Sequence, residues 1–473
     1  MCYNNGMDPE ARARRQSRRV IISEALMVLT VIATVSILGF IVSGYWVGSD
    51  FKIERQGLLQ IYSTPTGADV DVDGNPSSWL QRTNTSKTLS AGKHTITLTK
   101  DGYDSWSRTV NIAEGLLYRL HYPRLFLKER VKETALESSA NFVTISPDRN
   151  NMVLANNTTS WQLVNLDTDN IKPVDIDLSA VLPFTSRAKD ASIGLFSGNI
   201  KSATWASDNE HLLLKIEQNG TNNWLLINVK NPNNSINLTK EFNADFTKIK
   251  ILDQSASNLL VILDGNLHRI DASAKQISAV LISGVDTFDH YEQTIVFTAK
   301  KPDSEGYYLG LSRLGSEEIE QLKDLESPVK VVITKFYDDE YIGLVDHNSI
   351  RLYTKKDFEE KATFELSFIP EKIKVGASGE AIVMSTGGQV ATIDMEAQEL
   401  FEWNTETNEF GWLDSSMIYA VKDGSLNIYD FNGLNHRVLS SNVSSHFPVT
   451  VTSDKYLYYF QDGNLIREYL FEK

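Results

Sequence analysis

Eight short, strongly apolar segments recur through residues 151–460, and each is followed by a polar turn and a second strand-like segment. The apolar segments begin at residues 151, 211, 259, 294, 341, 381, 417 and 456, so successive starts lie 35 to 60 residues apart. A further β-rich run leads into each of them through a polar turn. Each unit of about 40 residues is too small to bury its apolar strands alone, and it must pack against its neighbours.

Repeats of this length, with about four strands each, predict a β-propeller over residues 142–473. Eight copies predict eight blades; seven blades, with one unit split across the ring closure, are the alternative. The repeats resemble WD40-like and TolB-type propellers through Ser146-Pro147-Asp148 and the weaker Ser207-Asp208, but they lack the Gly-His and Trp-Asp signatures of true WD40 repeats. The resemblance implies a fold and leaves the function open.

The first interval between repeats is the longest because it contains an insertion, residues 170–201. Long insertions between regular elements are commonly functional. A lid that packs on the propeller and stabilises it is the alternative. If the insertion binds a partner, the candidate contact residues are its apolar side chains Leu182, Phe184, Leu195 and Phe196.

The N-terminal region predicts a membrane anchor. Residues 25–47 carry no charge over 23 residues, or roughly 34 Å of helix, which is enough to cross a bilayer core of about 30 Å. The preceding tail, residues 1–19, holds five arginines against Asp8 and Glu10, a balance that keeps it in the cytoplasm. We therefore expect a transmembrane helix over residues 20–48 with everything after it outside, and a cleaved signal sequence is the alternative. The anchor residues are Arg18, Arg19, Leu29, Ile32, Ile37, Phe40, Tyr45 and Trp46.

Residues 57–127 alternate apolar and polar side chains between turn signals and contain no helical stretch, so they predict a small antiparallel β-sandwich. The segment resembles a PEGA domain, with the family motif standing as Pro65-Thr66-Gly67-Ala68 and Thr in place of Glu. The resemblance implies a non-catalytic module outside the membrane. The matching positions are Pro65, Gly67, Ala68, Asp73, Gly74, Gly92, Gly102 and Tyr103.

Three aspartates in this segment have the spacing of half a calcium loop. Asp69, Asp71 and Asp73 precede Gly74 as the first ligands of an EF-hand do, but the twelfth position is Leu80 in place of a bidentate Glu. Aspartates two apart on a strand share its solvent face, and Asp-Gly favours a type I′ hairpin turn. We therefore predict an exposed strand edge and no metal site.

Residues 128–141 join the two regions. The sequence KERVKETALESS has helical composition without an apolar stripe wide enough to reach a core, and this predicts a short connector.

Composition limits the chemistry. A net charge of −15 argues against nucleic acid as a partner, and the single cysteine, Cys2, excludes an intrachain disulfide. The eight histidines are scattered, and no hydrolase, phosphate-loop or dinucleotide motif occurs, so we expect no catalytic residue, cofactor or metal.

These observations predict a membrane-anchored binding or scaffold protein of the cell envelope, which presents its propeller to a protein or a cell-wall polymer and is not an enzyme. The alternative is an envelope enzyme, a glycan hydrolase or lyase. If the chain is such an enzyme, carboxylates or histidines with perturbed pKa values should converge in the central channel of the propeller, the funnel. A funnel lined by Ser, Asn and Lys would count against an enzyme.

Overall fold

The computed structural model describes residues 9–42, 45–47, 53–76, 82–138, 140–156, 160–182, 199–218, 220–302, 304–316, 318–376, 379–452 and 455–470. The chain divides into two compact units: residues 1–101 with 105–125, and residues 102–104 with 126–473. Each unit is described by itself.

The first unit begins with helix α1 (Pro9–Val42). Its window Ile22–Gly39 is long and apolar enough to cross a membrane, and none of it is buried by other parts of the chain; a signal sequence has the same properties. The helix is shorter at its C-terminal end than predicted, because residues 45–47 form strand β1 and pair with β2.

Two four-stranded sheets follow in the first unit. One joins β1 (Tyr45–Val47), β2 (Ile53–Ile61), β5 (Thr85–Ser90) and β8 (Leu117–Leu120), and the other has the order β4 (Asn75–Pro76), β3 (Asp69–Val72), β6 (Gly92–Thr99) and β7 (Trp106–Ile112). The alternating pattern buries one face of each sheet, with Leu59, Ile96 and Trp106 fully enclosed. One pair departs from the predicted antiparallel sandwich, since β8 runs parallel to β2.

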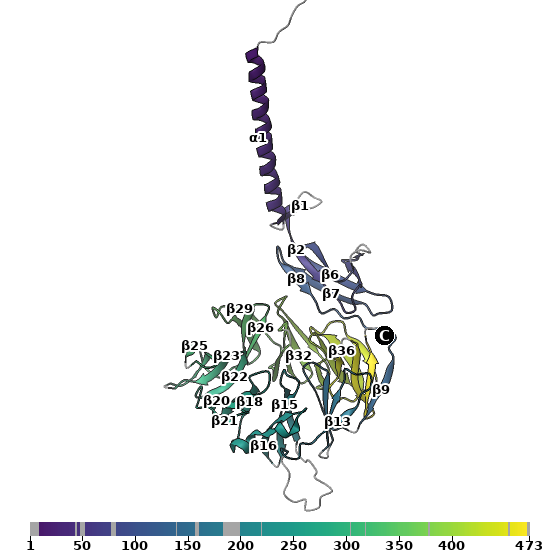
Figure 1. Cartoon of the computed structure of the whole chain (residues 1–473), viewed down its shortest axis with the longest axis vertical. Coiled ribbons are helices and arrows are strands. Elements are labelled where there is room, and N and C mark those ends of the chain that lie inside the picture. The colour runs from purple at the N-terminus through teal and green to yellow at the C-terminus, as the bar shows by residue number, and fades with distance from the viewer. Residues whose placement is uncertain are drawn as a thin grey trace, which may run out of the picture. The chain divides into compact units, whose positions relative to one another are not determined.

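The second unit contains eight four-stranded antiparallel sheets arranged as a ring (Figure 1). We number these blades in chain order. Blade 1 has β10 (Phe142–Ile145), β11 (Asn151–Ala155), β12 (Trp161–Asn165) and β13 (Pro173–Ile176), and blade 2 has β14 (Asn199–Trp205), β15 (His211–Gln218), β16 (Thr221–Asn228) and β17 (Ile236–Asn237). Blade 3 has β18 (Lys248–Ile251), β19 (Asn258–Leu263), β20 (Asn266–Asp271) and β21 (Gln276–Ile277), and blade 4 has β22 (Val285–Tyr291), β23 (Thr294–Lys300), β24 (Tyr307–Arg313) and β25 (Ile319–Leu325).

Blades 5 to 7 repeat this pattern in chain order: blade 5 has β26 (Lys330–Phe336), β27 (Asp339–Asp346), β28 (Ser349–Thr354) and β29 (Glu360–Glu365), and blade 6 has β30 (Lys372–Val375), β31 (Ala381–Thr386), β32 (Gln389–Asp394) and β33 (Glu399–Asn404). Blade 7 has β34 (Phe410–Trp412), β35 (Met417–Lys422), β36 (Ser425–Asp430) and β37 (Arg437–Ser440). Blade 8 departs from the pattern, because it joins β38 (Thr450–Thr452), β39 (Tyr456–Gln461) and β40 (Asn464–Tyr469) with β9 (Lys132–Glu137) from earlier in the chain. Blade 2 also carries the short helices η1 (Pro232–Asn234) and α2 (Leu238–Phe242).

The eight predicted apolar segments are the second strands of the eight blades, from β11 to β39. Apolar clusters join each blade to the next, and one of them packs Met152 and Leu154 of blade 1 against Tyr458 and Phe460 of blade 8. The clusters therefore close the ring, and the fold is an eight-bladed β-propeller.

The segment 128–141, predicted as a short connector of helical composition, contains a strand. Strand β9 lies within it and pairs antiparallel with β40, so blade 8 takes its fourth strand from the N-terminal side of the propeller. Arg467 of β40, which is 7% exposed, donates from Nε to Glu133 of β9 at 2.7 Å. Pairing with an otherwise open sheet edge outweighs the helical preference of a short segment.

Candidate functional site

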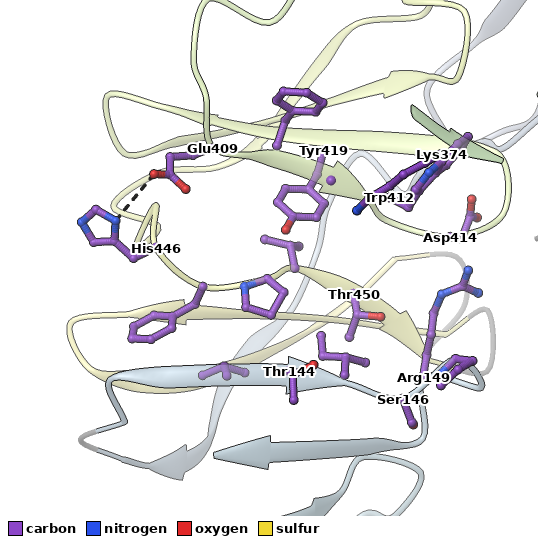
Figure 2. Close-up of a pocket in the computed structure, with 18 of the residues that line it drawn as sticks. Thr144, Ser146, Arg149, Lys374, Glu409, Trp412, Asp414, Tyr419, His446 and Thr450 are labelled. Carbon is purple, nitrogen blue, oxygen red and sulfur yellow. Dashed lines mark ion pairs between the residues drawn. The ribbon is translucent and has the colours of Figure 1, made fainter. Parts of the chain in front are cut away.

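Two cavities open among the inner strands, the first strand of each blade. One, of about 550 Å³, is lined by β10, β30, β34 and β38 with the loops beside them (Figure 2). The other, of about 490 Å³, is lined by β14, β18 and β22. Both volumes lie in the range of known small-ligand sites, roughly 300–1,000 Å³.

The first cavity has polar groups at both ends and mixed walls between them. Glu409 and His446 form an ion pair at one end, with Oε1 and Nδ1 3.7 Å apart (Figure 2). Arg149 and Asp414 line the other end (Figure 2). The walls between are lined by Thr144, Lys374, Trp412, Tyr419 and Thr450.

Tyr419 illustrates how the walls are fixed. Its side chain is buried, and burial raises the pKa of its phenol to about 12. The ring therefore stays neutral at physiological pH and serves as a rigid wall. Thr144 is held from the opposite side, because its Oγ1 accepts a hydrogen bond from Trp205 Nε1 at 3.0 Å, which ties blade 2 to blade 1.

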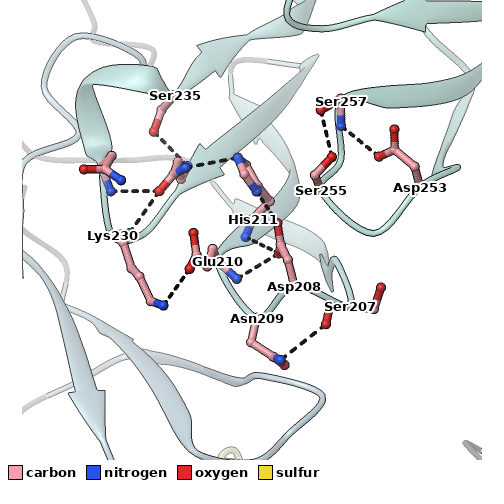
Figure 3. A network of polar contacts seen from close by, with 12 residues as sticks. Ser207, Asp208, Asn209, Glu210, His211, Lys230, Ser235, Asp253, Ser255 and Ser257 are labelled. Atoms are coloured by element: carbon pink, nitrogen blue, oxygen red, sulfur yellow. Dashed lines mark hydrogen bonds and ion pairs between the residues drawn. The ribbon is translucent and has the colours of Figure 1, made fainter.

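Aspartate-pinned turns hold the loops between the first and second strands. In blade 2, Asp208 Oδ1 accepts hydrogen bonds from the backbone N–H groups of Glu210 and His211 at 2.9 and 3.0 Å, and its Oδ2 lies 2.6 Å from His211 Nδ1 (Figure 3). The other ring nitrogen of His211 contacts Asn228 Nδ2 at 3.1 Å. Burial raises the pKa of Asp208, but these hydrogen bonds outweigh it and the net pKa is lowered.

The same turn recurs in other blades and links them. Asp148 N donates to Asn209 Oδ1 at 3.0 Å, and Asp208 N donates to the Gln254 carbonyl at 3.1 Å, so the turns of blades 1, 2 and 3 are connected in series. The sequence motifs found Asp148 and Asp208. They missed Asp253 and Asp414, which pin equivalent turns without a preceding serine. An aspartate shortly before the apolar segments that begin at residues 151, 211, 259 and 417 was the available signal.

The ionisable side chains that line the second cavity include Lys248, Lys250 and His290, from blades 3 and 4. Lys250 of β18 forms an ion pair with Asp289 of β22, and Asp289 Oδ2 also accepts from the Ile333 N–H of β26 at 3.1 Å. Burial and, to a lesser extent, the charge of Lys250 lower the pKa of Lys248 to about 8, although Asp289 and Asp286 act in the opposite direction. Burial, followed by the charge of Lys250, likewise lowers the pKa of His290. A lysine with a pKa of about 8 exchanges its proton near neutral pH.

Lys248 gives a pH-dependent prediction. Its folded-state pKa of about 8 lies below the ordinary 10.5, so between these values the unfolded chain binds the proton that the native chain has lost, and stability rises with pH. Below pH 8 the native state carries the cost of the desolvated charge. Lys248→Met should therefore stabilise the propeller at pH 7 by about 1–2 kcal/mol and flatten this rise, as measured by urea unfolding across pH.

Lys250→Met is the matched control, since it removes a neighbouring lysine that has a carboxylate partner. It should destabilise the propeller by leaving Asp289 uncompensated. Equal effects of the two substitutions would contradict the assigned difference between these lysines.

The three aspartates of the first unit all have protein partners. Asp69 pairs with Arg82 at 2.9 Å, Asp71 accepts from Gly74 N, and Asp73 accepts from Thr95 N at 2.7 Å. The Thr95 N–H and His94 lower the pKa of Asp73. Asp73 and Gly74 have φ values of +54° and +77°, as a type I′ turn requires. Over the described ranges, no group of three or more His, Cys, Asp or Glu side chains could hold a metal ion.

The remaining motif positions within residues 57–127 fall at turns and strand ends. Ala68 is fully buried, and its N–H donates to Thr83 Oγ1 at 2.9 Å. Pro65 and Gly67 form the corner before β3, and Tyr103 forms an isolated bridge with Leu127. Positive φ values, from +77° to +127°, occur at Gly67, Gly92 and Gly102.

The predicted insertion and anchor residues are described in part. Leu182 is buried in the cluster between blades 1 and 2, so it supports the fold and does not offer a contact surface. Phe184, Leu195 and Phe196 lie outside the described residues. Leu29, Ile32 and Ile37 are exposed on α1. Arg18, Arg19 and Phe40 belong to α1, and Tyr45 and Trp46 belong to β1; their side chains are outside the description.

Comparison with known families matches residues 56–123 to the PEGA domain, which confirms the resemblance seen in the sequence. No curated protein sequence matches the chain.

Solved structures similar to the chain share little sequence with it. The C-terminal WD40 domain of Sif2 is 12% identical, with 72% of this chain and 99% of that chain covered and a TM-score of 0.47. Oligogalacturonate lyase from Vibrio parahaemolyticus is 11% identical, with 56% and 88% covered and a TM-score of 0.36. Dihydro-heme d1 dehydrogenase NirN is 11% identical, with 84% and 80% covered and a TM-score of 0.41.

Two of these three proteins are enzymes by name, and this corrects the sequence-based prediction that the chain is not an enzyme. The absence of short catalytic motifs does not exclude catalysis in a propeller, because its inner strands bring together residues that are far apart in the sequence. The chain therefore contains a PEGA domain at residues 56–123 and, after it, an eight-bladed β-propeller of WD40-like fold.

Proposed function

We propose that the chain is a single-pass membrane protein that holds its PEGA domain and propeller outside the membrane, and that the propeller binds a protein or a cell-wall polymer of the cell envelope. The exposed apolar window of α1 and the arginines before it support the anchor and its direction. The 550 Å³ cavity among the inner strands carries the binding proposal.

The composition of that cavity suits recognition of a polar ligand. Trp412 offers an aromatic face, Thr144 and Thr450 offer hydroxyl groups, and Lys374 and Arg149 offer cations. A few polar groups fixed on apolar walls are typical of sites that orient one ligand.

The single cysteine allows a direct test of topology. Cys2 should react with a membrane-impermeant maleimide only after the cells are permeabilised, because the N-terminal tail is cytoplasmic. In a Cys2→Ser background, a cysteine placed at the exposed position 356 should react in intact cells. The reverse pattern, or loss of the N-terminal tail from the mature protein, would contradict the proposed anchor.

Binding can be tested with the full-length chain in lipid nanodiscs, offered insoluble wall material and solubilised envelope proteins. Trp412→Ala should weaken retention at least about tenfold if the cavity holds the ligand, since aromatic anchors dominate such sites. Leu434→Ala, on the outer turn of the same blade, is the control and should bind as the wild type does. Equal retention of both variants would remove the cavity from the proposal.

The second cavity favours a second candidate, an envelope enzyme that acts on glycans. Lys248, Lys250 and His290 line it and Asp289 pairs with Lys250, and the lowered pKa of Lys248, about 8, suits proton transfer near neutral pH. Release of soluble fragments from wall material by the wild type, and its loss in Lys248→Met, would support this candidate. Retention without release would favour binding alone.

A further inference from the structure

We infer that inner strand β30 carries an anion-binding site, formed by Lys372 and Lys374 beside Trp412, which takes successive carboxylate or phosphate groups of an acidic polymer. This inference rests on the proposed function, because it names the ligand class of the same cavity.

The two lysines share one face of one strand. They are two residues apart on β30, where they pair with Ser385 and Val383 of β31, so their side chains point the same way. Both line a small recess of about 70 Å³ with Ser385 and Trp412. Lys374 also lines the 550 Å³ cavity, so the recess and the larger cavity meet at this side chain.

Neither lysine has an anionic partner. Across the described part of the chain, Lys372 and Lys374 form no ion pair and no side-chain hydrogen bond. Both lysines are exposed on β30, and Lys374 faces both the recess and the 550 Å³ cavity. Burial lowers the pKa of Lys374, and the charge of Lys372 lowers it further, with no carboxylate acting in the opposite direction.

Three other inner-strand lysines have partners. Lys250 pairs with Asp289, Lys201 pairs with Glu217, and Lys330 Nζ donates to the carbonyl oxygens of Pro370 and Glu371 at 2.7 and 3.1 Å. The carboxylates that line the 550 Å³ cavity are also engaged, since Glu409 pairs with His446 and Asp414 accepts from its own turn. Within the described residues, Lys335 of β26 also has no ion pair or side-chain hydrogen bond, so β30 differs in carrying two such lysines on one face of one strand.

The charge of the inner strands is opposite to that of the chain. The eight inner strands hold seven lysines (201, 248, 250, 330, 335, 372 and 374) and two aspartates (286 and 289), whereas the whole chain has a net charge of −15. Like charges gathered on converging strands repel one another, and a bound anion relieves that repulsion. The concentration of lysine at the centre of an acidic protein favours an anionic ligand for the cavity.

The geometry indicates a repeated anion. Alternate residues of a strand lie about 6.6 Å apart, so the two ammonium groups can meet successive charges of a linear polymer. Lysine acts as a point charge and does not require the planar bidentate geometry of arginine, so carboxylates and phosphates both fit. Trp412 supplies an apolar face against which a sugar ring or a polymer backbone can pack.

The test uses the full-length chain in nanodiscs of neutral lipid and three probes: an oligoglucuronate, a linear polyphosphate and a neutral dextran oligomer. We expect the wild type to bind at least one anionic probe and not the dextran. Lys372→Gln/Lys374→Gln should weaken that binding at least about tenfold and lower the slope of log affinity against log salt by about 1–2.

The matched control is Lys172→Gln/Lys356→Gln, which removes the same charge from exposed outer loops of blades 1 and 5. It should change affinity by less than about twofold if the effect is local. Preference for oligoglucuronate would identify a carboxylate polymer, and preference for polyphosphate would identify a phosphate polymer.

Two results would overturn the inference: equal binding by the wild type and the β30 double variant, or no binding of either anionic probe by the wild type. The proposed function fails separately. If wall material is retained by the wild type and by the β30 variant alike, and high salt does not release it, the propeller is a binding module whose ligand is not held by these lysines.

Discussion

Replacing Glu468 by alanine should lower the free energy of unfolding of the propeller by about 3–5 kcal/mol, because the substitution leaves a partly buried arginine without its counter-charge. Glu468 of β40 is 4% exposed, and its Oε1 accepts from Arg130 Nε at 2.7 Å. Its Oε2 accepts from Tyr459 at 3.0 Å. Arg130 also donates to the carbonyl oxygens of Leu127 and Leu439, each at 2.8 Å. One ion pair thus joins the segment that leads into β9 to blades 7 and 8.

The double variant Arg130→Ala/Glu468→Ala should cost less than the sum of the two single variants, since no unpaired charge remains. Urea unfolding followed by tryptophan fluorescence measures all three. Glu359→Ala breaks an exposed pair with Lys361 and serves as the control, with an expected cost below about 1 kcal/mol. Additive costs for Arg130 and Glu468 would show that they do not act as a pair.

Gly433→Ala should destabilise the propeller by about 2–4 kcal/mol, from two independent costs. Gly433 has a φ of +78°, where an L side chain is strained, and a Cβ built there would lie 2.5 Å from Trp403 Cγ. Because Trp403 lies on β33 of blade 6 and Gly433 follows β36 of blade 7, the overlap would push two blades apart.

Gly265→Ala separates the two costs. Gly265 has a similar φ of +75° with nothing within 4 Å of the added carbon, so only the backbone strain of about 1 kcal/mol applies. Trp403→Leu should recover part of the loss in the Gly433→Ala background by opening space. Similar unfolding midpoints for Gly433→Ala and Gly265→Ala would contradict the steric contribution.

The repeat architecture could be predicted from the sequence because each second strand is almost wholly apolar and recurs at a regular interval. Segments such as residues 259–263 and 456–460 are buried on both faces between blades, and this removes the ambiguity of half-exposed strands. Strand β9 could not be predicted. Its alternation is weak, and its partner β40 lies more than 300 residues away, so only tertiary pairing determines its conformation.

The candidate site was less accessible to sequence reasoning for a different reason. The runs Lys248-Ile249-Lys250 and Lys372-Ile373-Lys374 have the alternation of ordinary solvent-exposed strands. Whether such lysines face bulk water or a central cavity depends on which edge of the sheet lies nearest the ring axis. Alternation along one strand contains no information about that edge, so the inferred preference of the cavity for an anionic ligand could not be predicted from the sequence.

The position of β9 in the chain also determines how the protein carries force. If the chain is anchored at its N-terminus as proposed, a ligand held by the propeller and fixed to a distant structure would pull against that anchor, and the tension would enter the propeller through the segment that leads into β9. That strand is held to β40 by backbone pairing from Lys132 to Glu137 and by the Arg130–Glu468 pair beside it. The strand that closes the ring is therefore also the first to be loaded, and its rupture force limits the tension under which the ring stays closed.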